Sequence, residues 1–335
     1  MRKIAIVTDA WHPQINGVVT TLTRTVKDLI DFGYQVKTIT PQAYPTVRCP
    51  TYPEISIALA RPKSIANDLF SFRPNCIHIA TEGPLGWAAR SICKRRRFAF
   101  STSYHTRFPE YLRMRLPVPL RLTYKIVKAF HNAAENTMVA SKTLMQELHS
   151  RGFTRTSLWS RGVDTHLFRP GKKDSISSVR PVFMYVGRVA VEKNIEAFLK
   201  LDLPGSKYVV GDGPVRESLS RKYPRVCFTG FRTGQELRDL FAAADVFVFP
   251  SLSDTFGVVL LEAMASGVPV AAYPVTGPID TVINGVNGYL DNDLRQAALK
   301  ALTVSPLSCR EFAKQYSWKA CSSQFLNNLI IQKQH

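Results

Sequence analysis

Two acidic residues eight positions apart stand in the most informative segment of the chain, residues 249–270. A buried strand is followed by a loop with Asp254 and Gly257, and then by a helix that contains Glu262. The loop-to-helix junction exposes backbone N–H groups, which form a natural site for a phosphate. Glu262 lies among apolar residues, where an unpaired carboxylate is costly, so a hydroxyl-rich ligand such as a ribose or hexose would satisfy both acids. The alternative is an Asp254 that caps the helix and a Glu262 paired with a lysine or arginine.

Arg188 and Lys193 form a second set of residues that could take part in binding or catalysis. Both follow the apolar run Val182–Val186 and precede a helical pattern, which predicts a loop at the carboxyl end of a strand. Arginine offers a planar fork of donors and lysine a point charge, so together they can hold a diphosphate. The alternative is that both cations are merely solvated.

A glycine pair, Gly211 and Gly213, ends the next apolar run. A dinucleotide-binding fingerprint requires a third glycine, but Arg216 stands at that position, which argues against an oxidoreductase with a nicotinamide cofactor. Phe231 ends the following strand segment, and its backbone groups are expected to line a base pocket.

Two segments in the first half of the chain also follow buried strands. Gly17 opens the first helix and would let the backbone approach a ligand closely, with an ordinary glycine turn as the alternative. His105 stands in a strand-end loop with an arginine and two tyrosines, where it can donate hydrogen bonds to a sugar. A structural role is the alternative for this histidine.

The elements that must position these residues alternate between short apolar runs and helical patterns. Such strands predict parallel sheets covered on both faces, and the alternation restarts after residue 170. We therefore predict two doubly wound, Rossmann-like α/β domains over residues 1–170 and 171–315, facing across a cleft, with a C-terminal helix in 316–335 that packs back on the first. An amphipathic helix is expected at Val18–Phe32. The predicted strands are Ile4–Thr8, Gln35–Thr40, Cys76–Ala80, Phe98–Ser103, Thr137–Ala140, Val182–Val186, Tyr208–Val210, Val226–Phe228, Val246–Phe249 and Val268–Ala272.

Composition excludes several classes of protein. The 335 residues carry a formal net charge of +19, with 25 basic and 10 acidic residues in 1–170. No apolar stretch is long enough to span a membrane, and the basic-then-apolar start is too short for a secretory signal. The six scattered cysteines predict buried, reduced thiols of a cytoplasmic protein, and no zinc or disulfide framework.

The basic excess is concentrated in two segments of the first domain, one around Lys94–Arg97 and the other between Arg107 and His131. The second predicts a basic amphipathic helix after Pro119, which fits an interfacial helix on anionic lipid. A solvated domain face is the alternative. Nucleic acid is disfavoured, because no recognition motif accompanies the charge. The cations proposed to meet membrane or acceptor are Arg107, Arg113, Arg115, Arg121, Lys125 and Lys128.

In combination these motifs resemble the retaining glycosyltransferases of family 4, and the resemblance covers nearly the whole chain. It implies the GT-B fold, with the acceptor mostly on the first domain and the nucleotide-sugar donor mostly on the second. The segments that carry it are Ile15–Val18, Tyr104–Thr106, Arg161–Asp164, Gly187–Asn194, Gly211–Pro214, Asp254–Val270 and Tyr316–Trp318.

The resemblance implies a donor site on the second domain. Arg188 and Lys193 would hold the diphosphate and stabilise the leaving group, Glu262 would bind the ribose, and Asp254 would hold hydroxyls of the transferred sugar. The family usually has glutamate where Asp254 stands, which bears on the identity of the sugar. Further donor-binding positions would be Gly213, Phe231, Phe256, Gly257 and Val258.

On the first domain, Gly17 would meet the phosphates and His105 would contact the sugar near its anomeric carbon. Asn16 replaces the first of two adjacent glycines that the family often has. The resemblance implies no metal or other cofactor, and the nucleotide sugar is the co-substrate. The acidic pair Asp291 and Asp293 is expected to cap a helix and not to bind a metal. No covalent nucleophile stands out, which favours front-face displacement.

The sequence thus predicts a metal-independent hexosyltransferase that uses GDP-mannose or a UDP-hexose and glycosylates a membrane lipid or glycolipid at the cytoplasmic leaflet, as a peripheral enzyme. The alternatives are a soluble or polysaccharide acceptor, a nucleotide-sugar epimerase of the same fold, or a basic nucleic-acid-binding protein.

Overall fold

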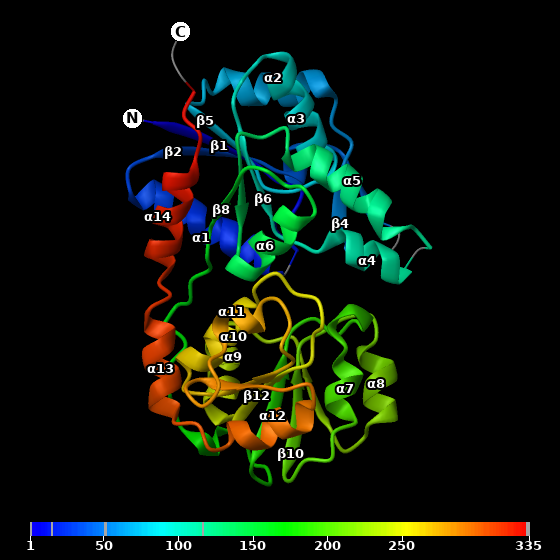
Figure 1. Cartoon of the computed structure of the whole chain (residues 1–335), viewed down its shortest axis with the longest axis vertical. Coiled ribbons are helices and arrows are strands. Elements are labelled where there is room, and N and C mark those ends of the chain that lie inside the picture. Colours follow the sequence, from blue (N-terminus) through cyan, green and yellow to red (C-terminus); the bar gives the residue numbers. More distant parts are fainter. Residues whose placement is uncertain (1, 15, 50–51, 116, 333–335) are drawn as a thin grey trace. The chain divides into compact units, whose positions relative to one another are not determined.

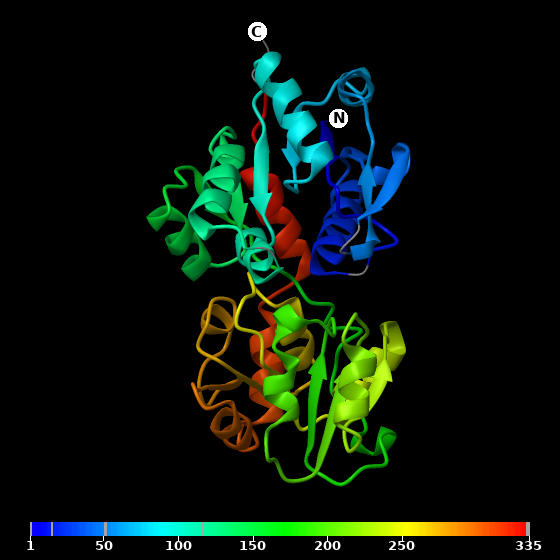
Figure 2. The same ribbon diagram turned by 90° about the vertical axis from the view of Figure 1, so that its right-hand side faces the viewer.

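The computed structural model describes residues 2–14, 16–49, 52–115 and 117–332, without the side chains of residues 49, 52–55, 114 and 115. The chain divides into two compact units, of which the first comprises Met1–Ser160 with Trp318–His335 and the second Arg161–Ser317. Each unit is built on a six-stranded parallel sheet with helices packed against it (Figures 1 and 2). The predicted α/β class with two parallel sheets is confirmed.

The first sheet has the strand order β2-β1-β5-β6-β7-β8. These strands are β1 (Lys3–Val7), β2 (Gln35–Ile39), β5 (Cys76–Ile79), β6 (Ser101–Tyr104), β7 (Asn136–Val139) and β8 (Thr156–Leu158). The helices are α1 (Gly17–Asp31), α2 (Pro62–Ser71), α3 (Pro84–Arg95), α4 (Phe108–Arg115), α5 (Leu120–His131), α6 (Lys142–Ser150) and α14 (Trp318–Asn328). A separate antiparallel hairpin pairs β3 (Thr46–Cys49) with β4 (Tyr52–Ala58), and a single 3₁₀ turn, η1 (Pro41–Ala43), precedes it.

Both faces of the first sheet are covered, so the side chains of its central strands are buried on both faces, including polar ones such as His78 on β5 and Ser101 on β6. Ala5 on β1 belongs to a core cluster with Leu69 of α2 and Leu85 of α3. On β5, His78 stacks edge-on against Phe325 of α14, with ring centroids 4.8 Å apart. Helix α14 therefore belongs to the same folding unit as the N-terminal strands.

The predicted helix at Val18–Phe32 is present as α1. The side chain of Asn16 caps it by accepting hydrogen bonds from the backbone N–H groups of Val18 and Val19, each at 3.0 Å. Gly33 follows the last turn with φ +87°, a conformation that favours glycine.

The second sheet has the order β11-β10-β9-β12-β13-β14. Its strands are β9 (Val182–Val186), β10 (Ser206–Val210), β11 (Cys227–Gly230), β12 (Val246–Phe249), β13 (Val270–Ala272) and β14 (Gly288–Leu290). The α-helices are α7 (Ile195–Leu199), α8 (Arg216–Lys222), α9 (Gly234–Ala243), α10 (Val258–Ala265), α11 (Pro278–Thr281), α12 (Leu294–Ala301) and α13 (Pro306–Lys314), with 3₁₀ turns η2 (Lys173–Ser175) and η3 (Val191–Lys193).

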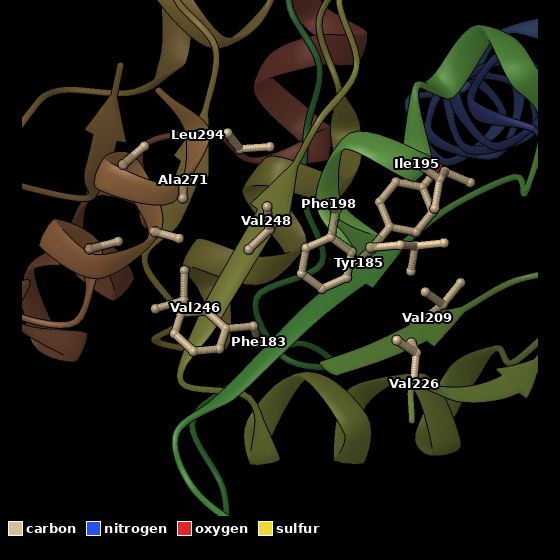
Figure 3. Packing of buried hydrophobic residues seen from close by; sticks show 14 of the residues in the cluster. Phe183, Tyr185, Ile195, Phe198, Val209, Val226, Val246, Val248, Ala271 and Leu294 are labelled. Atoms are coloured by element: carbon tan, nitrogen blue, oxygen red, sulfur yellow. The ribbon is translucent and has the colours of Figure 1, made fainter. Parts of the chain in front are cut away.

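Alternate residues of the central strands fill one core of the second unit. Figure 3 shows Phe183 and Tyr185 of β9 beside Val248 of β12, with Phe198 of α7 and Leu294 of α12 packed over them. Phe247 of β12 points to the other face and stacks on Phe241 of α9. Sheet burial on both faces fixes where each strand ends and hence where the site loops begin.

All five cysteines whose side chains are described are free thiols, as predicted. Four of the five are also buried, as predicted. Cys227 is exposed, because β11 is the edge strand of its sheet. The side chain of Cys49 lies outside the described residues.

Candidate active site

The loop after β9 is held in a fixed conformation by its own backbone and by the end of β12. Asn194 adopts the left-handed region with φ +51°, and its side-chain amide donates to the carbonyl of Pro250 at 3.0 Å. The hydroxyl of Tyr185 donates to the carbonyl of Arg188 at 2.9 Å. Arg188 and Lys193 are therefore presented from a braced loop. The contribution of Asn194 was missed from the sequence, although asparagine is a residue type that tolerates this backbone conformation.

The glycines after β10 let two strand-end loops pack in direct contact. A Cβ added at Gly211 would lie 1.9 Å from the carbonyl oxygen of Gly187, and one at Gly213 would lie 2.3 Å from that of Val189. The N–H of Val189 donates to the carbonyl of Asp212 at 2.9 Å. In this structure Gly213 thus supports the loop of Arg188 through close backbone packing.

Lys193 and Asp254 come from different loops and meet in an ion pair. The Nζ atom of Lys193 lies 2.7 Å from Oδ2 of Asp254, and both side chains are mostly buried. Asp254 also accepts a hydrogen bond from the N–H of Thr255 at 2.9 Å. The alternative that Asp254 caps the next helix is wrong, because Gly257 occupies the N-cap position of α10.

Helix α10 begins without a side-chain cap. Gly257 stands at its N-cap with φ +82°, where a Cβ would lie 3.0 Å from Leu260. Phe256, just before it, is buried, and its carbonyl lies against Gly277. Because glycine has no side chain that could cap the first turn, which starts at Val258, this turn suits an external acceptor such as a ligand oxygen.

Glu262 lies on α10 with its side chain partly buried. No hydrogen bond or ion pair joins its carboxylate to any residue that the structure describes, so the alternative of a lysine or arginine partner is not found there. Burial raises the pKa of the Glu262 carboxyl to about 7. A ligand with hydroxyl donors would satisfy this group and favour its charged form.

Two further predicted positions differ in their surroundings. Phe231 follows β11 with 41% of its surface exposed, so its ring is not part of the core. Gly17 forms the first residue of α1, and nothing lies within 4 Å of a Cβ added there. Neither packing within the first unit nor a left-handed backbone requires glycine at position 17. This disfavours the alternative that Gly17 is an ordinary glycine turn.

His105 follows β6 and is 6% exposed. Its ring stacks edge-on against Trp159 with centroids 5.4 Å apart. Two other histidines of this unit have structural partners. His78 of β5 forms hydrogen bonds with Ser101 and Ser103, and His131, at the end of α5, contacts Glu82 at 2.9 Å. Burial lowers the pKa of His78 to about 3, so it is neutral at physiological pH.

Arg107 must be removed from the predicted basic surface. It is 8% exposed, and its guanidinium forms a two-pronged ion pair with Glu147 and a contact of 3.3 Å with Glu110. Its charge is neutralised inside the first unit, where it ties the loop after His105 to α6.

The remaining cations lie on α4 and α5. The predicted amphipathic helix is present as α5, which follows Pro119, and Arg121 and Lys125 are exposed on it while Lys128 is half-buried. Arg113 of α4 is also exposed, and the side chain of Arg115 lies outside the described residues.

Within the described ranges, no group of three or more histidine, cysteine or acidic residues is arranged to hold a metal ion. Asp293 caps α12 by accepting from the N–H groups of Arg295 and Gln296, as the sequence predicted. None of the described helices has the length and apolarity needed to cross a membrane.

Comparison with known proteins identifies the class. A family profile described as "Glycosyltransferase Family 4" matches residues 15–167, and one described as "Glycosyl transferases group 1" matches residues 180–304. A GDP-mannose-dependent alpha-mannosyltransferase of Corynebacterium glutamicum is 31% identical over 86% of this chain and 76% of its own length. The sulfoquinovosyl transferase SQD2 of Arabidopsis thaliana is also 31% identical over 88% of this chain, which spans 63% of that longer protein. An alpha-monoglucosyldiacylglycerol synthase of Streptococcus pneumoniae is 24% identical over 91% of this chain and 79% of its own length.

Solved structures show the same fold. A sucrose-phosphate synthase from Thermosynechococcus elongatus aligns with a TM-score of 0.74 at 22% identity, covering 98% of both chains. Anabaena HepE in complex with UDP-glucose aligns with a TM-score of 0.72 at 17% identity, covering 98% of this chain and 99% of its own. Fold and sequence together define a nucleotide-sugar-dependent glycosyltransferase. The chain belongs to glycosyltransferase family 4, a family of retaining enzymes with the GT-B fold.

Proposed function

We propose that this enzyme transfers a hexose, from GDP-mannose or a UDP-hexose, to a lipid or glycolipid acceptor at the cytoplasmic face of a membrane. The mannosyltransferase relatives support the mannose donor, and the diacylglycerol-glycosylating relative supports a lipid acceptor. The enzyme would act there as a peripheral protein.

The observation that carries the lipid acceptor is the exposed face of α5. Leu122 is 51% exposed and Ile126 is 50% exposed, one turn apart, and the exposed cations Arg121 and Lys125 alternate with them. The opposite face, with Val127, is buried. Exposed apolar side chains beside cations are typical of a helix that lies in an anionic lipid interface, where each cation contributes roughly 1 kcal/mol.

For the donor, we assign the diphosphate to Arg188 and Lys193 and the ribose to Glu262. As the diphosphate arrives, the Lys193 ammonium would turn from Asp254 to a phosphate oxygen, which leaves the Asp254 carboxylate to accept hydroxyls of the hexose. The first turn of α10, after Gly257, would donate hydrogen bonds from its backbone N–H groups to the same ligand.

We assign transfer to a front-face displacement. The bond between the anomeric carbon and the phosphate oxygen breaks, the acceptor oxygen bonds to that carbon from the same side, and the departing phosphate takes the acceptor's proton. The cations stabilise the negative charge on the leaving diphosphate. His105 would contact the sugar near its anomeric carbon, and Gly17 would bring its loop to the phosphates.

The test is a matrix of labelled nucleotide hexoses against vesicles of defined lipid composition. We expect label in the lipid fraction for one donor. Label in a soluble glycan and in no lipid would contradict the lipid acceptor, and release of free altered sugar without an acceptor would favour an epimerase.

A further inference from the structure

The first unit contains a pocket of about 220 Å³ that none of the assigned donor residues lines. It is bounded by the segment after β1, by the η1 turn after β2, and by the β3–β4 hairpin. The lining residues are Trp11, His12, Pro13, Gln14, Pro41, Gln42, Tyr44, Thr46 and Ser56. We propose that this pocket binds one polyhydroxylated six-membered ring of the acceptor, a hexose or a cyclitol. The inference rests on the proposed glycosyl transfer.

The aromatic side of the pocket suits the C–H face of such a ring. Trp11 is only half-buried at the end of β1, and its ring meets that of His12 edge-on at 5.7 Å. No residue described in the structure accepts a hydrogen bond from its indole N–H. Trp11 thus offers both an apolar surface and a donor, which is the combination that a sugar ring needs.

The amide and phenol groups are held in place before any ligand binds. Gln42 donates to the carbonyl of His12 at 3.0 Å and Gln14 donates to that of Asp9 at 3.1 Å. The hydroxyl of Tyr44 donates to Asp68 at 2.7 Å. Because Gln42 still has its carbonyl oxygen available in the described structure, it presents an oriented acceptor to a ligand hydroxyl.

The hairpin adds two hydroxyl groups on one face. Thr46 pairs with Ala58 and Arg48 pairs with Ser56 in the antiparallel register, so alternation places Thr46 and Ser56 on the same face. Neither hydroxyl is hydrogen-bonded to a residue in the described part of the chain. Both are free to bond to ligand hydroxyls.

Size and charge select among ligands. Pockets for drug-sized ligands measure about 300–1,000 Å³, so this one holds a single ring. Its lining has no lysine or arginine, which disfavours a diphosphate, and no aliphatic side chain other than proline, which disfavours an acyl chain. A neutral ring with several hydroxyls remains.

The test compares Trp11→Ala and the double variant Thr46→Val/Ser56→Ala with the wild type. The double variant removes two hydroxyls at nearly constant volume, and Ser64→Ala, an exposed serine on α2, is the matched control. Transfer is measured to soluble methyl hexosides and inositols, and separately to the same rings carried on vesicle lipids, which distinguishes free from lipid-linked acceptors. Nucleotide-sugar hydrolysis without acceptor reports on the donor site.

We expect the acceptor KM to rise about tenfold or more in both variants, since each loses one or more ligand contacts, while hydrolysis without acceptor and the donor KM stay at the wild-type level. An unchanged acceptor KM in both variants would overturn the proposal that this pocket binds the acceptor. Saturation-transfer NMR of the soluble rings keeps the two proposals separate. If the wild type transfers no sugar, saturation transfer to a ring that is lost in Trp11→Ala still supports binding of the ring in this pocket. Equal saturation transfer from the wild type and from Trp11→Ala rejects it.

Discussion

At the residue scale, the ion pair between Lys193 and Asp254 governs the charge of the proposed donor site. The two groups neutralise each other across 2.7 Å, and in our proposal an arriving diphosphate draws Lys193 away from Asp254. Lys193 also compensates the charge of the Asp254 carboxylate, which is mostly buried and would be costly without a partner. In our proposal this ion pair links binding of the diphosphate by Lys193 to release of the Asp254 carboxylate for the sugar.

Lys193→Ala is expected to lower the transfer rate about a hundredfold or more, because a charge-assisted contact to the leaving group is lost. Lys200→Ala, whose exposed lysine pairs with Glu196 on α7, is the control and should be near wild type. Initial rates at saturating acceptor and a thermal melt check the prediction. A Lys193→Ala variant with near-native rate would refute the assignment.

Glu262 predicts a pH dependence of donor binding. Its carboxyl has a pKa of about 7 in the free protein, against an ordinary value of 4.5, because burial disfavours the charge. Ribose hydroxyls donate better to the carboxylate, so the donor KM should rise as the pH falls from 8 to 6, by up to about tenfold per unit below the pKa. Glu262→Gln should flatten this profile.

The pH affects stability in the opposite direction to donor binding: a rising pH favours donor binding but lowers the contribution of Glu262 to the free energy of unfolding. Since the folded-state pKa lies above the unfolded value, the folded protein binds the extra proton between pH 4.5 and 7, and this group's contribution to the free energy of unfolding decreases as the pH rises through that window. A KM that falls at low pH, or a Glu262→Gln profile identical to the wild type, would contradict the role of Glu262.

At the element scale, the exposed face of α5 should determine membrane binding. Replacing Leu122 and Ile126 together by serine removes apolar surface without changing charge, and should weaken vesicle binding about tenfold or more. Leu307→Ser, at an exposed leucine of α13, is the matched control. Cosedimentation with anionic vesicles measures the effect, and equal binding of both variants would argue for a merely solvated face.

The sequence predicted the central strands of both sheets, which are buried on both faces, and also the edge strands β2 and β11. The apolar runs at Val182–Val186 and Val246–Phe249 coincide with β9 and β12, which lie in the middle of their sheet. The edge strands β8 and β14 were not predicted, because each has three residues and partly exposed side chains. The β3–β4 hairpin was missed for a similar reason, since the described residues of β3 are exposed and the hairpin joins neither main sheet.

The same limit applies to the sites. Strand-end position alone picked out Arg188, Lys193 and Asp254, but the Lys193–Asp254 contact joins residues 61 positions apart and needs the folded sheet. Arg107 looked like its basic neighbours in the sequence and differs only because Glu147 folds against it. The pocket at Trp11 was also invisible, because its hydroxyls come from a hairpin with no apolar signature.

At the scale of the whole molecule, the net charge of +19 serves two purposes in our proposal. A few cations of the second unit act on the diphosphate, and the excess of the first unit draws the enzyme to anionic lipid. Vesicle binding should therefore weaken as salt rises from about 0.05 to 0.5 M, because the Debye length shortens, and should be slight on neutral lipid. Salt-independent binding, measured by cosedimentation, would instead indicate an apolar association.

Calorimetric titration of the full chain with GDP and with UDP tests the donor site most directly. We predict one site per chain for one of the two nucleotides, with affinity about tenfold or more lower in Lys193→Ala and in Glu262→Ala, since each variant loses a contact to the ligand. The melting temperatures should stay close to that of the wild type. Wild-type affinity in both variants, or binding of neither nucleotide, would contradict a donor site built on Arg188, Lys193, Asp254 and Glu262.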